Sequence, residues 1–570
     1  MTTPASPRHD PPVARSRRVV RVLLAAVVLP ILLGVVVVLV VAMTPWGNER
    51  ALRLLVSQAN GRLTGELAIG TLRGNLFTGA TLTDVRVVDS ARQPVFTARR
   101  AQVRYAFWPA LRGRIVIRSV ALDTAVVVLD KRPGGRWNFQ QLVRRGGAAK
   151  DTSRHSPTPQ VSNITIRHGR MLYRRPWSPD TTLSRSARDS VIARALLPTA
   201  RKRTERVAGG FQRVLDYHGM DARLPSIRLG SMGQPTAVEI AALSMLAEPY
   251  RLPAIDVRSL VGTLYASRDS LWWRDARMIL PASRVSGDGT IGFRRTGFRL
   301  DLAGAPIALA DLRWIDPSLP VEGGGALRYA MRVRGDTATF AVSGANVRYR
   351  NASISGRATA ARVTTKGRKS ELLVYDTDLT VARLTTKIIH ELVPSLRIRR
   401  SGTIDGHLAV SGPPRALQLD ADFRFDDVVA GLSHVTARGG LDIENGVRAR
   451  SLVLGLRPLQ LATINGAGVR LPIGGTVNGS ATVSGALREG WSVHGDLTHV
   501  DRGARSRVVG NGTYQIAGKR IVADATLEPL SLVTAGQFAP SAQLRGSVTG
   551  RVHAEGTMRA MRLSGALRSA

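Results

Sequence analysis

Residues 475–485 read GTVNGSATVSG, in which glycine or an apolar residue alternates with a polar residue at every position. The positions of the first set are Gly475, Val477, Gly479, Ala481, Val483 and Gly485. Successive side chains of a β-strand point to opposite faces, so this stretch predicts a strand with one apolar and one polar face.

The same eleven-residue alternation occurs three more times in the chain. It reads GTIDGHLAVSG at 402–412 and GSVTGRVHAEG at 546–556, with a weaker copy, GALRYAMRVRG, at 325–335. A turn and a second alternating segment follow each copy, beginning near residues 340, 417, 491 and 561. Repeated hairpins of this kind predict a mainly β fold over 221–570.

A sheet with one apolar face must cover that face. Helices are scarce in this part of the sequence, with short candidates only at 236–247 and 385–392. Three arrangements remain open: a row of sandwiches, a closed solenoid, or one long antiparallel sheet curled into a trough. An exposed apolar trough would need a ligand, and glycines on the apolar face would allow the sheet to curl tightly.

In the trough interpretation, the function depends on a surface of repeated apolar side chains. The candidate lining residues are Leu327, Met331, Val333, Ile404, Leu408, Val410, Val477, Ala481, Val483, Val548, Val552 and Leu563. The alternative is that these residues form the ordinary core of a sandwich or solenoid.

Composition excludes several classes of protein. The 570 residues include no cysteine, so disulfides, thiolate metal sites and cysteine nucleophiles are absent. The net charge is +40, but 74 of the 81 basic residues are arginine and they are spread over the whole chain. A bias of this kind is typical of genome composition, so we expect no nucleic-acid partner. The charge also leaves open a hypothesis in which the protein is a membrane-tethered binder of polyanions.

The N-terminus predicts a membrane anchor. Residues 22–43 contain no charged side chain and would span about 33 Å as a helix, enough to cross a bilayer. Basic residues are denser before this segment than after it, which predicts a cytoplasmic tail at 1–21 and an exported remainder. A cleaved signal peptide is the alternative, although its apolar core would be shorter.

Two further helices are expected outside the sheet. Asn48 can cap a short helix that ends at Gly61 and shields the open edge of the sheet. Residues 151–220 are expected to be a linker with a basic helical insert, because Phe211, Val214, Leu215 and His218 follow the basic run at 201–206 with helical spacing.

The region from 44 to 150 carries a family resemblance. Thr44-Pro45-Trp46-Gly47 is followed by GRLTGELAIGTLRGNLFTGATLTDVRVVD at 61–89, PVFTARRAQVRY at 94–105, LRGRIVIRSVALDTAVVVL at 111–129 and GRWNF at 135–139. The order of these elements resembles the amino-terminal region of the AsmA-like proteins, and among them the TamB (translocation and assembly module) branch.

The resemblance implies a single-pass bacterial inner-membrane protein whose periplasmic part is a β-taco, an apolar groove that conducts phospholipid acyl chains toward the outer membrane. An alternative family function is to help outer-membrane β-barrel proteins or autotransporters assemble and be secreted, without carrying lipid. Two features depart from the family: the basic insert at 181–219, and an end at Ala570 within a hairpin, which suggests a fragment or a shortened relative.

No catalytic motif accompanies these features, so we expect neither an enzyme nor a cofactor or metal site. Residues 287–292 (GDGTIG) match the spacing of a dinucleotide-binding loop, but further alternation follows them instead of a helix. Asp288-Gly289 is therefore interpreted as a hairpin turn. The ten histidines show no metal-binding spacing, and His407 and His553 are expected on the polar face of their strands.

Overall fold

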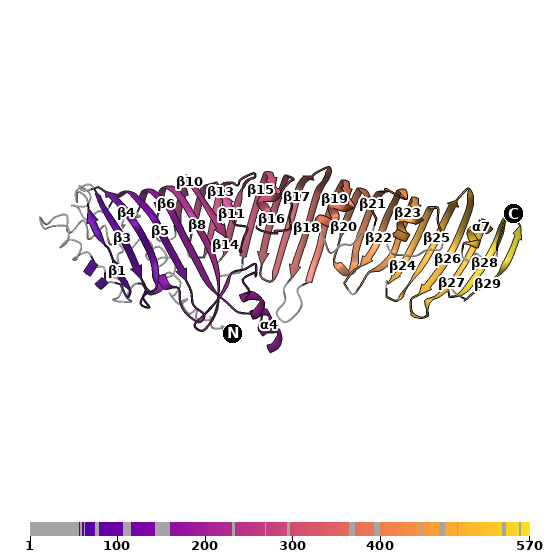
Figure 1. Ribbon diagram of the computed structural model, residues 1–570, viewed down its shortest axis with the longest axis horizontal. Helices are drawn as coiled ribbons and strands as arrows, with labels where there is room; N and C mark the ends of the chain where they lie inside the picture. Colours follow the sequence, from indigo (N-terminus) through magenta and orange to yellow (C-terminus); the bar gives the residue numbers. More distant parts are fainter. Residues whose placement is uncertain are drawn as a thin grey trace, which may run out of the picture. The chain divides into compact units, whose positions relative to one another are not determined.

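The structure is a computed structural model. It describes residues 56–57, 60–61, 63–73, 79–106, 116–142, 160–230, 234–267, 269–292, 297–363, 371–392, 400–444, 446–466, 473–486, 488–537, 543–557 and 560–569. The protein is mainly β, with 69% strand and few helices, as expected (Figure 1). The chain forms two compact units: unit 1 is Met1–Leu300 with Asp311–Pro317, and unit 2 is Asp301–Ala310 with Ser318–Ala570.

The predicted span at 22–43 lies outside the described residues. Among the residues that are described, no helix is long and apolar enough to cross a bilayer. Of the expected helix at 48–61, the described residues 56–57 and 60–61 are helical. The Asn60 side-chain amide donates a hydrogen bond to the carbonyl of Leu67 and accepts one from the backbone N–H of the same residue.

The described part of unit 1 consists mainly of sheet strands, with an exposed helix at Arg185–Leu196. Its elements are β1 (Glu66–Ala68), β2 (Thr71–Arg73), β3 (Gly79–Val88), β4 (Pro94–Tyr105), β5 (Ile117–Asp130), the 3₁₀ turn η1 (Asn138–Gln141), β6 (Gln160–Trp177), α4 (Arg185–Leu196), β7 (Thr204–Val207), β8 (Gly210–Arg228), β9 (Thr236–Ile240), β10 (Ala242–Glu248), β11 (Ile255–Val257), β12 (Ser259–Ala266), β13 (Ser270–Ile279) and β14 (Arg284–Gly292). The described strand pairs of unit 1 are antiparallel, as expected, except that β5 and β6 are parallel.

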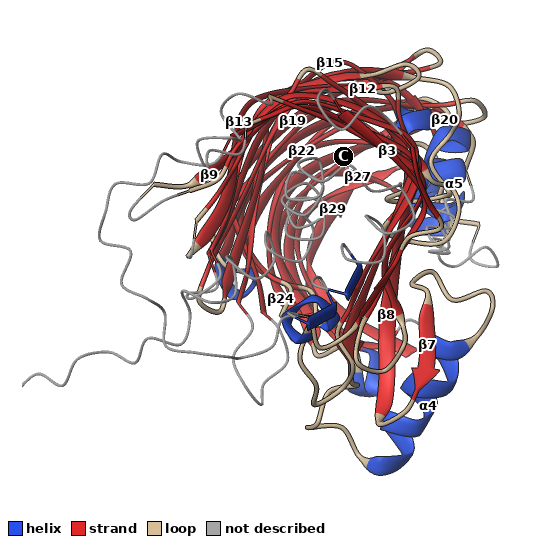
Figure 2. Ribbon diagram, turned by 90° about the vertical axis from the view of Figure 1, so that its left-hand side faces the viewer, coloured by secondary structure: helices blue, strands red, loops and turns tan. Residues whose placement is uncertain are grey.

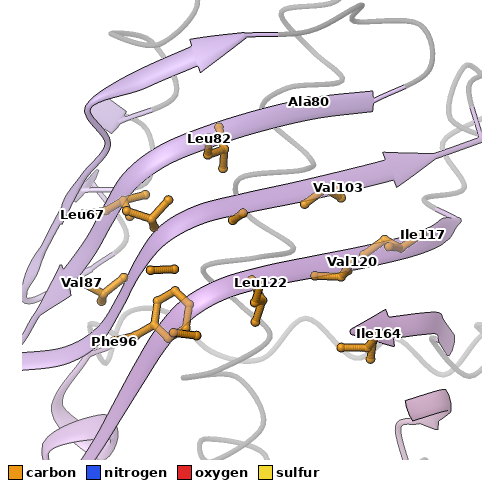
Figure 3. Packing of buried hydrophobic residues seen from close by; sticks show 14 of the residues in the cluster. Leu67, Ala80, Leu82, Val87, Phe96, Val103, Ile117, Val120, Leu122 and Ile164 are labelled. Carbon is orange, nitrogen blue, oxygen red and sulfur yellow. The ribbon is translucent and has the colours of Figure 1, made fainter. Parts of the chain in front are cut away.

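A fully buried core lies over β1 to β6 in unit 1. Figure 3 shows Leu82, Val103, Val120 and Ile164 pointing from neighbouring strands into one cluster. Phe139, from η1, packs into the same cluster at 2% exposure. Protein side chains therefore fill the apolar face at this end of unit 1.

Unit 2 contains β16 (Gly324–Arg334), β17 (Thr337–Tyr349), β18 (Ala352–Val363), β19 (Glu371–Thr385), α5 (Thr386–Leu392), β20 (Gly402–Ser411), η3 (Pro414–Ala416), β21 (Leu417–Asp427), β22 (Gly431–Asp442), β23 (Arg448–Gln460), α6 (Leu461–Gly466), β24 (Thr476–Ala486), β25 (Gly490–Asp501), β26 (Ala504–Gln515), η4 (Ala517–Lys519), β27 (Arg520–Ser531), α7 (Leu532–Gly536), β28 (Ser547–Thr557) and β29 (Ala560–Ser569). β15 (Gly297–Ala308) and η2 (Leu309–Leu312) extend over the division between the units.

The repeat in unit 2 is larger than a hairpin. Four consecutive antiparallel strands are followed by one short helix: α5 follows β19, α6 follows β23 and α7 follows β27. The backbone N–H of Leu461 and of Leu532, which begin α6 and α7, donates to the carbonyl of Gly475 and of Gly546 respectively. Gly475 directly precedes β24 and Gly546 directly precedes β28, and their φ values of 86° and 89° favour glycine. The expected helix at 385–392 corresponds to α5.

Three local expectations were wrong. Residues 236–247 form β9 and β10 because they pair with β12 and β8. The segment from Phe211 to His218 belongs to β8, and only α4 is helical in the insert. Residues 160–177 are strand β6 rather than linker, and β8 runs through the expected boundary at 220.

The expected turn at Asp288-Gly289 was also wrong. Both residues lie inside β14, where Asp288 Oδ1 accepts a hydrogen bond from the N–H of Asp275 on β13. This contact belongs to a set of bulges that recur through the sheets.

At each of these bulges, a strand residue in the left-handed conformation donates its backbone N–H to a side-chain oxygen on the next strand of the ladder. The four pairs are His168 with Asp221, Asp275 with Asp288, Arg383 with Asp405, and Ser451 with Ser484, at N···O distances of 3.0, 2.8, 2.8 and 3.0 Å. The strand register shifts at each position. Because bulges bend a strand and increase its twist, they account for the curved strands visible in Figure 2.

We expect Asp405→Ala to loosen the bulge at Arg383. The left-handed conformation costs a non-glycine residue about 1 kcal/mol, and the lost hydrogen bond contributes about 0.5–1.5 kcal/mol. Hydrogen–deuterium exchange should show faster exchange of the amides around Arg383. Asp405→Asn keeps an acceptor oxygen and should retain most of the protection; equal protection in wild type and Asp405→Ala would contradict this role.

Candidate functional site

The register of unit 2 produces uninterrupted apolar rows across its strands. One row, which we call the central row, runs from β19 to β29 through residues that are directly opposite one another. Its members are Leu379, Leu408, Ala421, Ala437, Leu454, Ala481, Gly495, Gly510, Ala525, Val552 and Gly565. At about 4.8 Å per strand, this row is roughly 48 Å long.

A second apolar row runs beside it on the same face. Its members are Val381, Gly406, Phe423, Val435, Leu456, Gly479, Leu497, Val508, Leu527, Gly550 and Leu567. Neither row contains a charged or hydrogen-bonding side chain. We call the face that carries both rows the apolar face.

The opposite face of the same strands is polar. The row one residue away from the central row consists of Asp378, Ala409, Asp420, Arg438, Val453, Thr482, His494, Asn511, Asp524, His553 and Ser564. Nine of these eleven residues are polar, so the two faces of the sheet differ sharply in chemistry.

Charges on the polar face are paired across strands. Arg438 donates to Asp420 at 2.6 Å, His407 lies 2.9 Å from Asp378, and His553 lies 2.7 Å from Asp524. The hydrogen bond with Asp524 raises the pKa of His553. His407 and His553 thus lie on the polar face, as their alternation predicts.

The structure brings all twelve predicted lining residues onto the apolar face. Leu327, Met331 and Val333 are in β16; Ile404, Leu408 and Val410 in β20; Val477, Ala481 and Val483 in β24; Val548 and Val552 in β28; and Leu563 in β29. The pairings Tyr329–Val342–Ala358–Thr377–Val410 join the face of β16 to that of β20. Ala481 is buried, Leu563 is 69% exposed, and the other ten are half-buried.

Half-burial distinguishes the apolar face from the core of unit 1. Val87 and Val103 in unit 1 are 0% and 5% exposed, whereas Leu408, Leu454 and Val483 keep part of their surface accessible. Among the described residues of unit 2, the fully buried apolar side chains are mostly alanines or belong to strand ends and the short helices, such as Ile388 and Leu461. Neighbouring side chains on the curved sheet account for this partial burial.

Small residues reduce the side-chain bulk of the central row from β24 to β27. Its members in β24 to β27 are all glycine or alanine. A hollow over β26 to β29 belongs mainly to the polar face, because eight of its twelve lining residues, among them Asn511, Asp524, His553 and Ser564, lie on that face. Gly510 is required by close strand approach, because a Cβ there would lie 2.2 Å from the carbonyl oxygen of Asp524. Gly512 differs, since a Cβ there would meet nothing closer than 3.7 Å.

The third and fourth strands of each repeat also line the apolar face, and sequence reasoning missed them. Leu452, Leu454 and Leu456 of β23 lie opposite Val483, Ala481 and Gly479 of β24. Their own period-two alternation was a usable signal. Metal ligation is not indicated by the described residues, which hold no cluster of three suitable side chains.

No protein-family model, curated protein or solved structure matches this chain. Function is therefore inferred from the geometry and chemistry of the apolar face.

The two glycines make a matched pair for testing this geometry. Gly512→Ala should change the thermal unfolding midpoint of the full chain little, because the added methyl group contacts Ala523 Cβ at an ordinary 3.7 Å. Gly510→Ala should lower the midpoint by several degrees, since β26 and β27 must separate to admit the methyl group. Equal stability of both variants would contradict the strand spacing described here.

Proposed function

We propose that the apolar face of unit 2 shelters phospholipid acyl chains and conducts them across the strands, along the two apolar rows. The observation that carries this proposal is the pair of apolar rows, which continue through β19 to β29 without a polar side chain. A continuous apolar path suits an elongated apolar ligand better than a discrete pocket does.

The energetic reason is desolvation. Exposing a methylene group to water costs about 0.8 kcal/mol, so a palmitoyl-sized chain costs on the order of 12 kcal/mol. A wall with no polar interruption lets such a chain move while it stays buried. The charged headgroup can remain in water at the open side of the groove.

The alternatives of a sandwich or a closed solenoid fit less well. In a sandwich, the leucines of β19 to β23 would face a second sheet and be fully buried. Leu408 and Leu454 are only half-buried, although Leu417 and Leu456 are buried. In a closed solenoid, β29 would pair with a distant strand. In the described part of unit 2, β20 to β28 pair only with their neighbours in sequence, and β29 pairs with β28.

The proposal includes the cellular setting. We place the chain in the AsmA-like group, in its TamB branch, as a bacterial inner-membrane protein anchored by residues 22–43. Its bulk would lie in the periplasm, where it would carry phospholipid toward the outer membrane and contribute to outer-membrane biogenesis. The uncharged segment, the basic tail at 1–21 and the order of elements over 44–150 support this setting.

Substitutions on the two faces of β24 test the lipid-binding role. Val483 lies on the apolar face opposite Leu452 and Val493, and Thr482 lies on the polar face opposite Val453 and His494. Val483→Asp should reduce the phospholipid that co-purifies with the full chain at least severalfold, because a carboxylate would interrupt the apolar path. Native mass spectrometry of the detergent-solubilised protein measures the bound lipid.

The matched control is Thr482→Asp, which adds the same charge to the polar face and should retain wild-type lipid. Both variants should show the circular dichroism spectrum of the wild type. Equal lipid occupancy in the two variants would refute the lipid conduit. A wild-type protein free of lipid would point instead to a scaffold for outer-membrane protein assembly.

A further inference from the structure

The insert between β6 and β8 in unit 1 carries a strong local excess of positive charge. From Arg174 to Arg213 the sequence holds ten basic and three acidic residues. The segment folds into the exposed helix α4 and the strand β7, which pairs with β8.

Three arginines and two aromatic rings meet where β6, β8 and β7 pair. Arg175 lies opposite Arg213, and Trp177 opposite Phe211, which in turn lies opposite Arg206. Directly opposite residues share a face. The Arg213 guanidinium stands 4.5 Å from the centre of the Trp177 ring, and that of Arg206 stands 5.4 Å from the centre of the Phe211 ring. The two rings pack edge to face at 6.0 Å. We call these five residues the arginine–aromatic cluster.

This cluster lacks a counter-charge. Within the part of the chain that the structure describes, Arg175, Arg206 and Arg213 have no carboxylate partner, and Glu205 is paired with Arg203 at 2.9 Å. Like charges directly opposite each other on paired strands are unfavourable. Burial, and then the neighbouring charge of Arg175, lower the pKa of Arg213.

A neighbouring cluster provides the contrast. Arg201 also lies over an aromatic ring, 4.6 Å from the centre of Tyr250, but it donates a 2.7 Å hydrogen bond to the carbonyl of Trp314. The Arg201 guanidinium therefore has a hydrogen-bond acceptor within unit 1. The arginine–aromatic cluster instead presents guanidinium groups that suit an external anion.

We propose that the arginine–aromatic cluster binds the phosphate groups of an anionic phospholipid surface. Arg175 and Arg206 are exposed while Trp177 and Phe211 are half-buried, so the cluster offers charge to its partner more than open ring faces. Recognition of bases would need free ring faces for stacking. A surface of phosphate headgroups is recognised by charge alone, which the exposed guanidinium groups supply. This role is independent of acyl-chain binding by unit 2.

Vesicle capture by the full chain tests the proposal. The protein is held on a sensor surface by a C-terminal tag and exposed to vesicles of phosphatidylcholine alone or mixed equally with phosphatidylglycerol. The difference between the two vesicle types isolates the charge-dependent part of binding. In the cluster Gln variant, glutamine replaces Arg175, Arg206 and Arg213 at once. The difference in binding between the two vesicle types should fall by about fivefold per arginine, roughly a hundredfold in all.

Three controls make the result specific. Replacing the exposed Arg277, Arg332 and Arg568 with Gln removes the same charge elsewhere and should retain most of the difference. Lysine at the three cluster positions should also retain most of it. The Val483→Asp variant should capture anionic vesicles as well as the wild type does, which separates this proposal from the conduit.

Wild-type capture by the cluster Gln variant, or an equal loss in the distant Gln variant, would overturn the proposal. If the cluster Gln variant lost binding to a single-stranded oligonucleotide but captured vesicles as the wild type does, the proposal would be overturned in favour of a nucleic-acid partner.

Discussion

The strand register of unit 2 is the constraint on which the rest depends. Because side chains alternate faces with a period of two, a slip of one residue between any two strands would move a whole set of leucines and valines to the polar side. The register holds through ten successive pairings from β19 to β29, including those in which Leu454 faces Ala481 and Ala525 faces Val552. Continuity of the apolar face is therefore a property of the ladder and not of any single residue.

Curvature follows from local departures from that ladder. At Arg383 and Ser451 an extra residue adopts the left-handed conformation, and a side chain on the next strand holds its N–H. The strand bends while the apolar residues on either side of the bulge stay on one face: Ala449 and Leu452 both lie opposite apolar-face residues of β24. Bending that keeps the apolar residues on one face accounts for the half-burial of leucines such as Leu408 and Leu454.

The same bulges limit what the sequence reveals. The eleven-residue copies that contain Val477 and Val483 alternate without interruption, so their strands and their apolar side could be predicted. In β23 the bulge shifts the alternation between Ala449 and Leu452, and the third and fourth strands of the repeat were missed. β8 was misread because its apolar spacing near Phe211 also fits a helix. Its strand conformation depends on pairing with β6, which is distant in sequence.

The most direct test asks what touches each side of β23. A photo-crosslinking residue, p-benzoylphenylalanine, would replace either Leu454 on the apolar face or its neighbour Val453 on the polar face, in the full chain within native membranes. The account predicts that irradiation yields a phospholipid adduct, seen by mass spectrometry, at Leu454 and not at Val453. Crosslinks from Leu454 only to other parts of the protein would contradict it, because side chains and not acyl chains would then fill the groove.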